Sequence, residues 1–394
     1  MSVFKESSIE KKKINIIFIV SDLSGIGGVQ TRTKNVLRAG NTRNCEYIAI
    51  SLRYDREFSM QNAYSLDRDE QEIIKILTEY SAKDTVLIIG NSIHSEYPPN
   101  IRKLFYKFPI IALSATQMAF MIQDSDILLR QDFLKENMAS CILSFSDGDI
   151  AFQRQLGIHG QRKIAPSVEI RKSNQYDLDR NKVFGYIGRL DFHTKDCERL
   201  IDIAHSFKKS NLPPLHIFTT NGRNSPDYQK FIEIAYKQDI LDHLEITLNC
   251  EDKVKMFSKL KMLILPSKKE ASGNAILEAF SFDVPVLAAS YAPGPAEIII
   301  SGSCGILLDD MSGDNALQNI EGLSDKKLKE MSGKAFERHK DFSITAHIDA
   351  IENIALEIIE KFDGFNKLLV LPRLRSVDIL MSKLTAHNSR AERS

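Results

Sequence analysis

Short apolar runs alternate along the first part of the chain with longer, polar-rich stretches. The runs are too short for helices and lack strict apolar/polar alternation, which is typical of strands buried on both faces of a sheet. The stretches between them, such as TRTKNVLRAG, have helical patterns. This alternation predicts βαβ units and a parallel sheet, with strands at INIIFIV, EYIAISL, TVLIIG, PIIALSA and SCILSFS.

The pattern changes around residues 165–182, which are polar and lack an apolar period, so we place a linker there. A second series of strands and helices follows, and residues 324–362 read as helix with one break near 341–343. We expect an α/β protein with two doubly wound, Rossmann-like domains that face a central cleft, and a helical C-terminus. The predicted second-series strands are KVFGYIG, PLHIFTT, LEITLN, KMLILP, VPVLAA and CGILLD.

Length and composition agree with two domains. The chain has 394 residues, more than one core usually supports. Lys plus Arg and Asp plus Glu both number 52, so net charge gives no reason to expect a nucleic-acid partner. The five cysteines lie far apart and form no CxxC or Cys/His cluster. They predict neither a zinc site nor disulfides, and they fit a reducing cytoplasm.

The N-terminus has one feature of a signal peptide, because Lys11, Lys12 and Lys13 precede an apolar run. That run is only seven residues long and ends at Ser21-Asp22, so we interpret it as a first strand. No run approaches the ~20 apolar residues that a membrane-spanning helix needs.

The loop after the first predicted strand is rich in glycine. In doubly wound sheets, ligands bind beyond the carboxyl ends of strands, where loops meet helix N-termini. Gly25 to Gly28 (GIGG) would let backbone N–H groups approach a phosphate there. Position 30 is Gln, so the dinucleotide fingerprint is absent, which disfavours a nicotinamide dehydrogenase. The alternative is a tight turn without a ligand.

Two cations follow the first strand of the second series. Arg189 and Lys195 lie six residues apart in GRLDFHTKD, so both can reach one anion from a loop. Arginine offers a planar fork and lysine a point charge, which together suit a diphosphate. The alternative is solvated surface charge.

Two carboxylates surround a glycine turn in PSKKEASGNAILEAF. Glu270 falls in the loop after a buried strand, and Glu278 falls in the second turn of the next helix, so both can face one ligand from different heights. The helix N-terminus attracts phosphate, and carboxylates accept hydrogen bonds from sugar hydroxyls. A nucleotide sugar satisfies this arrangement. The alternative is that Glu270 caps the turn and Glu278 is solvated.

Together these segments resemble glycosyltransferase family 4, the retaining nucleotide-sugar transferases with the B-type fold of two Rossmann domains, also called glycosyl transferases group 1. The resemblance covers roughly residues 14–360 and is strongest in the second domain. GRLDFHTKD is similar to the family's "GRL…K" element, and Glu270 and Glu278 are similar to its E-x7-E pair. The segment VPVLAASYAPGPAEIIISGSCGILLD is similar to the family's "G-x-P-V…G-P-x-E-I-I…G-x-L".

The resemblance implies a role for each matching position. Arg189 and Lys195 would neutralise the donor diphosphate, Glu270 would hold the donor sugar as a candidate catalytic residue, and Glu278 would bind the ribose hydroxyls. Backbone groups from both sides of the cleft would contact the sugar and the phosphates, namely Ser272, Gly273 and Asn274 from the second domain and Gly27 and Gly28 from the first.

It also implies the reaction. The nucleoside diphosphate departs, the acceptor attacks on the same face, and the leaving phosphate takes the acceptor proton. Arg, Lys and a helix terminus supply positive charge, so we expect no metal and no other cofactor. The expectation is a metal-independent hexosyltransferase with a UDP- or GDP-linked donor and a glycan or lipid-linked acceptor. Family habit places it in bacterial envelope or exopolysaccharide synthesis.

The family also suggests domain roles and boundaries. We expect residues 1–172 to form the N-terminal, acceptor-side domain and residues 173–345 to form the C-terminal, nucleotide-sugar-binding domain. Residues 346–362 would be a helix that returns to the N-terminal domain, and residues 363–394 a basic tail.

Several positions depart from the family pattern. Many relatives carry a His where this chain has Ala115, and His94 is the nearest alternative at a strand end. Asp283 stands where the family usually has Gly. The second domain of the family often has a glycine pair that contacts the phosphates, and the corresponding segment here reads TTNGRN, so Asn221 and Gly222 are the candidate contacts. These departures keep open a catalytically silent transferase-like partner. A nucleotide-sugar epimerase of the same architecture is the other alternative.

Two further features carry less weight. Three D-x-D sequences, at 67–69, 124–126 and 177–179, match the metal-binding motif of A-type transferases, but a motif found three times is weak evidence. The tail holds six Lys or Arg against three Asp or Glu, and four apolar residues fall near one helical face, Leu374, Val377, Met381 and Leu384. It could bind the inner face of a membrane as an interfacial helix, bind a partner, or stay a solvated end.

Overall fold

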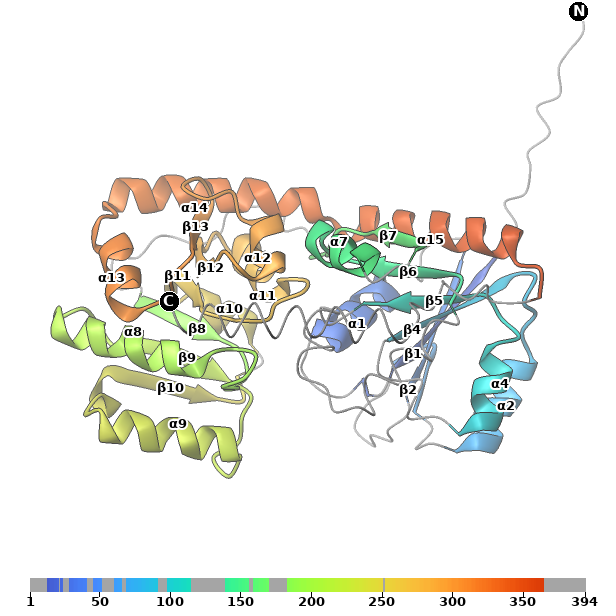
Figure 1. Cartoon of the computed structure of the whole chain (residues 1–394), viewed down its shortest axis with the longest axis horizontal. Helices are drawn as coiled ribbons and strands as arrows, with labels where there is room; N and C mark the ends of the chain where they lie inside the picture. The colour runs from blue at the N-terminus through green and yellow to red at the C-terminus, as the bar shows by residue number, and fades with distance from the viewer. Residues whose placement is uncertain are drawn as a thin grey trace, which may run out of the picture.

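The structure is a computed structural model. It describes residues 13–20, 22–23, 28–40, 45–51, 60–65, 69–90, 98–114, 139–155, 159–169, 183–250 and 252–364. These residues form two halves, each built on one parallel sheet with helices packed against it (Figure 1). This is the expected α/β architecture of two doubly wound, Rossmann-like units with a helical C-terminus.

The first half holds a seven-stranded sheet in the order β3-β2-β1-β4-β5-β6-β7. All its strand pairs are parallel. Its strands are β1 (Asn15–Val20), β2 (Glu46–Ser51), β3 (Ala63–Ser65), β4 (Thr85–Gly90), β5 (Ile110–Leu113), β6 (Cys141–Ser144) and β7 (Gln161–Lys163). Its helices are α1 (Gly28–Gly40), α2 (Glu70–Thr78), α4 (Pro99–Phe105) and α7 (Asp147–Gln155).

The central strand β1 explains the unbroken apolar runs. Ile17 and Ile19 pack into one hydrophobic cluster with α2 and α4, whereas Ile16 and Phe18 pack into a second cluster with α1. Successive side chains of a strand point to opposite faces, and here helices cover both faces. The β1 side chains on both faces of the sheet are therefore apolar, as the sequence predicted.

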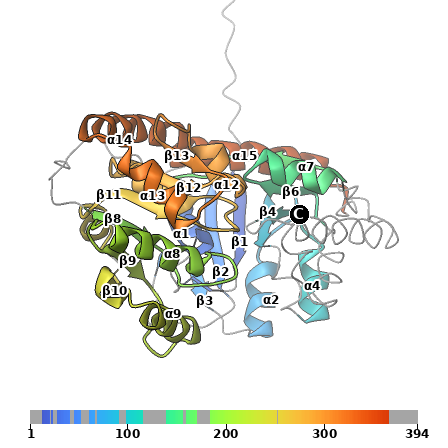
Figure 2. The same ribbon diagram turned by 60° about the vertical axis from the view of Figure 1, so that its left-hand side comes forward.

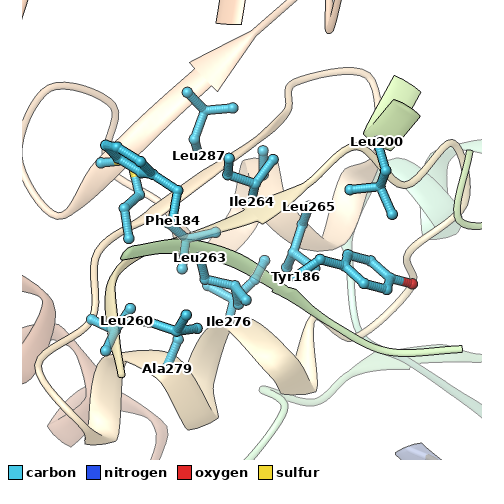
Figure 3. Close-up of a cluster of buried hydrophobic side chains, with 14 of the residues drawn as sticks. Phe184, Tyr186, Leu200, Leu260, Leu263, Ile264, Leu265, Ile276, Ala279 and Leu287 are labelled. Atoms are coloured by element: carbon cyan, nitrogen blue, oxygen red, sulfur yellow. The ribbon is translucent and has the colours of Figure 1, made fainter. Parts of the chain in front are cut away.

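The second half repeats this topology with six strands in the order β10-β9-β8-β11-β12-β13. The strands are β8 (Val183–Ile187), β9 (Leu215–Thr219), β10 (Leu244–Leu248), β11 (Leu260–Leu265), β12 (Val286–Ala289) and β13 (Gly305–Leu308). The helices are α8 (Cys197–Lys209), α9 (Pro226–Lys237), α10 (Lys253–Phe257), α11 (Asn274–Ser281), α12 (Pro293–Ile298) and α13 (Gly313–Glu321). Figure 3 shows part of its single core, where side chains of β8, β11 and β12 meet those of α8 and α11.

Every apolar run named in the sequence became a strand, but two strands were missed. Strands β3 and β7 are three residues long, read AYS and QRK, and lie at the two edges of the first sheet. Three residues with so few apolar side chains leave no apolar run to find.

The C-terminal helices run along one side of both halves (Figures 1 and 2). Helix α14 (Asp325–His339) packs on the second half, and after the short turn at Lys340–Phe342 helix α15 (Ile344–Lys361) packs on the first sheet. The predicted helix break near 341–343 is confirmed. Four α15 side chains enter the core beside β1 and α1, namely Ile348, Ile351, Ala355 and Ile358. The expected boundary at 172/173 and nearly all of the tail lie outside the described residues, so the domain bounds stay a prediction.

Polar contacts also join the two halves. Val168 pairs with Ser343 in an isolated parallel bridge. Val168 lies before the first strand of the second half, and Ser343 lies just before α15, which returns to the first half. Glu297 of α12 accepts a hydrogen bond from the Asp147 backbone N–H at the start of α7 (2.7 Å), and Lys163 bonds Glu297 and Asp147 (2.7 and 2.6 Å). The same carboxylate thus caps a helix of the other half.

Within the described part of the chain, no helix combines the length and the apolar composition needed to cross a bilayer.

The contact between α15 and the first half predicts a pH dependence of stability. His347 is buried and its Nδ1 lies 2.7 Å from the Ala165 carbonyl oxygen. Burial, followed by the positive charge of Arg32, lowers the pKa of His347 to about 4. An unfolded histidine has its ordinary pKa near ~6.5, so between these values the unfolded chain binds a proton that the folded chain does not.

Stability from His347 should therefore be fully present above pH 6.5 and should decline as the pH falls toward 4, by up to about 3 kcal/mol. Urea unfolding from pH 7 to 4.5 measures this slope. His347→Gln should flatten it, and an unchanged slope in that variant would contradict the assignment.

Candidate functional site

In each sheet, the first and fourth strands are the pair at which the strand order reverses. The loops after β8 and β11 in the second half meet the start of α1 from the first half. A cavity of about 200 Å³ lies between them. Its walls come from both halves, with Gly28, Val29 and Arg32 on one side and Arg189, Thr194, Lys195, Lys269, Glu270, Ala271 and Ser272 on the other. We call this cavity the cleft.

Two helices begin at the cleft and face each other. The Asn274 side chain at the start of α11 donates a hydrogen bond to the Gly28 carbonyl oxygen at the start of α1 (3.1 Å). A Cβ at Gly28 would lie 2.9 Å from Asn274 Nδ2, so glycine permits this approach. Neither helix has an acidic residue in its first turn. The positive ends of both dipoles are therefore uncompensated by their own helices, which favours an anion between them.

The loop that carries Arg189 and Lys195 is fixed by its own polar groups. Asp191 accepts hydrogen bonds from the backbone N–H groups of His193 and Thr194 and from the Thr194 hydroxyl (2.9, 2.8 and 2.6 Å). Burial alone would raise the pKa of Asp191, but these bonds outweigh it and hold the pKa below its ordinary value. The carboxylate is therefore charged at neutral pH and keeps the turn closed.

Asn221 supports the same loop from the end of β9. Its side chain accepts a hydrogen bond from the Leu190 N–H (2.6 Å) and donates one to the Leu190 carbonyl (3.2 Å). The structure thus places Asn221 behind the loop and not among the residues that line the cleft.

The loops after β8 and β11 are joined at three points. Lys268 Nζ lies 3.0 Å from Asp196 Oδ1, the Lys269 N–H donates to the Thr194 carbonyl (3.1 Å), and Lys195 Nζ lies 2.5 Å from Glu270 Oε2. The last pair is largely shielded, with side chains 21% and 15% exposed. Lys195 and Glu270, 75 residues apart in the sequence, are therefore neighbours in the cleft. Their assignments to the diphosphate and the donor sugar stay predictions.

Two glycines hold the Glu270 loop in place. Gly273 has φ +59° at the start of α11, a conformation that favours glycine, and its N–H donates to Glu270 Oε1 (3.3 Å). The Gly294 N–H donates to the Glu270 carbonyl (2.8 Å). A Cβ at Gly294 would lie only 2.6 Å from that carbonyl oxygen, so α12 can approach the loop only with glycine there.

The second predicted carboxylate has another partner. Glu278 Oε1 lies 2.8 Å from Lys253 Nζ at the start of α10, and its side chain is 20% exposed. The two glutamates thus bond different lysines, and Glu278 is not among the residues that line the cleft. Its assignment to the ribose hydroxyls stays a prediction.

The remaining predicted positions divide into two groups. Gly27, His94 and Ala115 lie outside the described residues. Asp283 lies beyond the C-terminal end of α11, at the opposite end of the helix from the cleft, with φ +59°. That backbone conformation explains why glycine is usual there, since Asp and Asn are among the few other residues that adopt it readily. The departure at Asp283 is therefore distant from the cleft.

Three polar side chains among the described residues that line the cleft were not singled out from the sequence. Thr194 and Lys269 lie in loops beside predicted residues. Arg32 lies on the buried stripe of α1, with Thr33, Val36 and Leu37. A charged residue in an apolar stripe is the signal that could have identified it.

The cleft is suited to an anion with hydroxyl groups. The side chains of four cations and one carboxylate are among its described lining residues, and the N-termini of α1 and α11 meet beside it. Burial lowers the pKa of Lys269, whose Nζ lies 2.8 Å from His193 Nε2. Within the described ranges, no group of three or more His, Cys, Asp or Glu residues could hold a metal ion. Of the three D-x-D sequences, only Asp69 is described, and it caps α2.

A family model matches most of the second half of the chain. Residues 168–339 match the model for glycosyl transferases group 1. This segment contains β8 to β13 and every predicted site residue of the second half.

Individual proteins and structures agree with this match. The chain is 21% identical over 234 residues to the capsular polysaccharide biosynthesis glycosyltransferase CapM of Staphylococcus aureus, a match over 57% of this chain and 59% of that relative. The crystal structure of TarM superposes with a TM-score of 0.71 at 12% identity, over 89% of this chain and 99% of TarM. Anabaena Alr3699/HepE in complex with UDP-glucose gives 0.68 at 14% identity, over 86% and 99%. These likenesses show the B-type fold of two Rossmann-like domains.

The packing of α12 against the Glu270 loop predicts the effect of one methyl group. Gly294→Ala should displace the loop and lower the free energy of unfolding by about 1–3 kcal/mol, because the new Cβ meets a backbone oxygen that cannot rotate away. Gly333→Ala is the matched control, since no atom lies within 4 Å of a Cβ there. In the interior of α14 it should be neutral or stabilising by up to ~1 kcal/mol. Chemical denaturation measures the free energy of unfolding of both variants. Equal changes in the two variants would contradict the packing argument.

Proposed function

Because residues 168–339 match the model for glycosyl transferases group 1, we propose that this chain is a retaining, metal-independent glycosyltransferase. It moves a hexose from a nucleotide sugar to a glycan or lipid-linked acceptor. The match to this family model supports sugar transfer in general. The cleft supports the more specific parts of the proposal, which are a nucleotide-sugar donor and charge stabilisation without a metal.

The observation that carries the proposal is the set of charges around the facing helix N-termini. Arg189 and Lys195 reach the cleft from one loop, while the starts of α1 and α11 meet beside them. A guanidinium fork, an ammonium group and helix N-terminal N–H groups all prefer phosphate oxygens. Glu270 lies in the same cavity and can accept hydrogen bonds from sugar hydroxyls.

The proposed reaction is the one that the family resemblance implies. The bond between the sugar's anomeric carbon and the diphosphate oxygen breaks, and a bond to the acceptor hydroxyl oxygen forms on the same face. The acceptor proton passes to the departing phosphate oxygen, so no separate base is needed. Arg189 and Lys195 stabilise the charge that develops on the leaving diphosphate, and Glu270 positions the sugar.

Lys195 also has a reason to pair with Glu270 when no donor is present. The contact at 2.5 Å neutralises both groups in a cavity that would otherwise hold a lone carboxylate among cations. A donor diphosphate would take over part of the lysine's hydrogen bonding and release one oxygen of Glu270 for the sugar. The pair thus keeps both groups in place before the substrate arrives.

Donor and pathway are proposed from the relatives. Alr3699/HepE was crystallised with UDP-glucose, which supports a uridine-linked donor ahead of a guanosine-linked one. CapM is named for capsular polysaccharide biosynthesis, which supports a role in bacterial surface polysaccharides. A place at the inner face of the membrane remains part of this proposal.

Nucleotide binding gives the first test. UDP at 100 times its Kd should stabilise the protein by ~2.7 kcal/mol, whereas the non-cognate nucleotides GDP and ADP should shift the melting temperature less. Arg189→Ala removes a charge-assisted contact and should weaken UDP binding about 10- to 100-fold. Arg154→Ala, an exposed arginine in the last turn of α7, is the matched control and should leave it unchanged. Titration calorimetry measures both, and absence of a shift with every nucleotide would refute donor binding.

The assignment of Glu278 has its own test. If Glu278 binds the ribose, wild-type protein should prefer UDP to 2′-deoxy-UDP about fivefold or more, since one hydrogen bond to a charged group is lost. Glu278→Ala should bind both nucleotides equally. A preserved preference in the variant would mean that Glu278 only holds Lys253, as in the ion pair described above.

Turnover separates the proposal from its competitors. Transfer from the donor only in the presence of acceptor, with the product in the donor's anomeric configuration, is the expected result. Conversion of the donor sugar without acceptor would indicate an epimerase. Nucleotide binding without either reaction would indicate a silent partner.

A further inference from the structure

Arg32 is a buried cation on the wall of the cleft that the mechanism above does not use. It lies in the second turn of α1, is 5% exposed, and its guanidinium lies over the Phe145 ring, 4.4 Å from the ring centroid. It lines the cleft from the first half, whereas Arg189 and Lys195 line it from the second. Phe145 orients the guanidinium plane but contributes no opposite charge.

This cation has no counter-charge among the residues that the structure describes. Its Nη2 atom is buried without a hydrogen-bond acceptor there, and no described carboxylate forms an ion pair with it. Burial lowers the pKa of Arg32 to about 10, with no opposing effect from a neighbouring acid, so the group is still protonated at neutral pH. The nearby His347 is neutral at that pH, because burial lowers its pKa to about 4.

An unpaired buried charge is costly, and the fold itself does not require it. Arg32 occupies a position on the apolar stripe of α1, where a methionine or leucine would pack without leaving a donor unsatisfied. Buried polar groups without a partner in native structures call for a specific explanation, such as an absent ligand. An oxyanion bound in the cleft would supply the missing acceptor.

The charges of the cleft leave room for a second anion besides the donor. Among the described residues that line the cleft, the side-chain cations are Arg32, Arg189, Lys195 and Lys269, and the carboxylate is Glu270. The diphosphate of a nucleotide sugar would neutralise about two of the positive charges that remain. Arg189 and Lys195 already account for that diphosphate, so Arg32, on the opposite wall, is left for another group.

We propose that Arg32 binds an oxyanion of the acceptor, so that the acceptor carries a phosphate or carboxylate close to the hydroxyl that is glycosylated. The planar fork of arginine matches both groups with two parallel hydrogen bonds, and its position on Phe145 holds that fork in one orientation. The inference rests on the proposed function, since it takes the wall formed by α1 as the acceptor side. It narrows the acceptor class from glycans in general to anionic ones.

The test compares three small probes that differ in one group: glycerol 1-phosphate, glycerate and glycerol. Each is titrated into the full-length protein saturated with UDP, at constant ionic strength, and binding is followed by nuclear magnetic resonance. Wild-type protein should bind at least one of the two anions ten times more tightly than glycerol. Arg32→Met, which keeps an unbranched, flexible stem and removes the charge and the hydrogen-bond donors, should lose this preference. Arg32→Lys should retain part of it.

Two further measurements separate ligand binding from a structural role. Without ligands, Arg32→Met should melt at the wild-type temperature or above it, because an unsatisfied buried charge has been removed. Its affinity for UDP should stay within twofold of wild type, and Arg154→Ala should match wild type in every measurement.

Three results would overturn the inference. Arg32→Met could weaken UDP binding as strongly as Arg189→Ala, which would assign Arg32 to the donor. It could lower the melting temperature without ligands, which would assign Arg32 to the fold. Wild-type protein could bind the anions no better than glycerol, which would leave Arg32 without an acceptor anion. If UDP itself does not bind, the proposed function fails, and titrating the same anions without UDP still tests Arg32.

Discussion

The approach of two helix N-termini, α1 from one half and α11 from the other, is the constraint on which the rest of this structure depends. Like ends of two dipoles repel each other, so they stay close only if rigid elements hold them there. The two parallel sheets do so, because α1 follows β1 and α11 follows β11, and each of these strands belongs to the pair at which the strand order of its sheet reverses. Glycines at positions 28, 273 and 294 then remove the side chains that would keep the backbones apart. The hydrogen bond from Asn274 to Gly28 is the direct result.

This arrangement concentrates positive charge in the cleft. Lys195 is compensated by Glu270, and Lys268 by Asp196, and these pairs also tie the two loops of the second half together. Arg32 is different, since an aromatic ring and a neutral histidine surround it. Compensated and uncompensated cations thus have different consequences. The ion pairs of Lys195 and Lys268 fix the shape of the cleft. Nη2 of the Arg32 guanidinium has no hydrogen-bond acceptor among the described residues and gains one only when an anion occupies the cleft.

Much of the fold and part of the site could be predicted from the sequence. Unbroken apolar runs such as 14–20 located most of the strands, because both faces of each sheet are covered. The rule that loops meet at strand ends placed Lys195 and Glu270 at one ligand, but their ion pair was not predicted. The short edge strands β3 and β7 left no apolar signal. The partner of Glu278 could not be predicted either, because it depends on where α10 starts in space, and no local pattern places Lys253 beside it. Asn221 was expected near a ligand, yet its amide matches the two backbone groups of Leu190.

The return of α15 to the first half has a consequence for the order in which the chain acquires structure on the ribosome. The core beside β1 includes Ile348, Ile351, Ala355 and Ile358, so it cannot be completed until nearly the whole chain has been synthesised. The core of the second half draws on residues no later than Phe342 and is available earlier. Domains that emerge first usually fold first. Here the later half is the first that can bury its full core, and the nascent first half exposes the apolar face of β1 and β4 until α15 arrives.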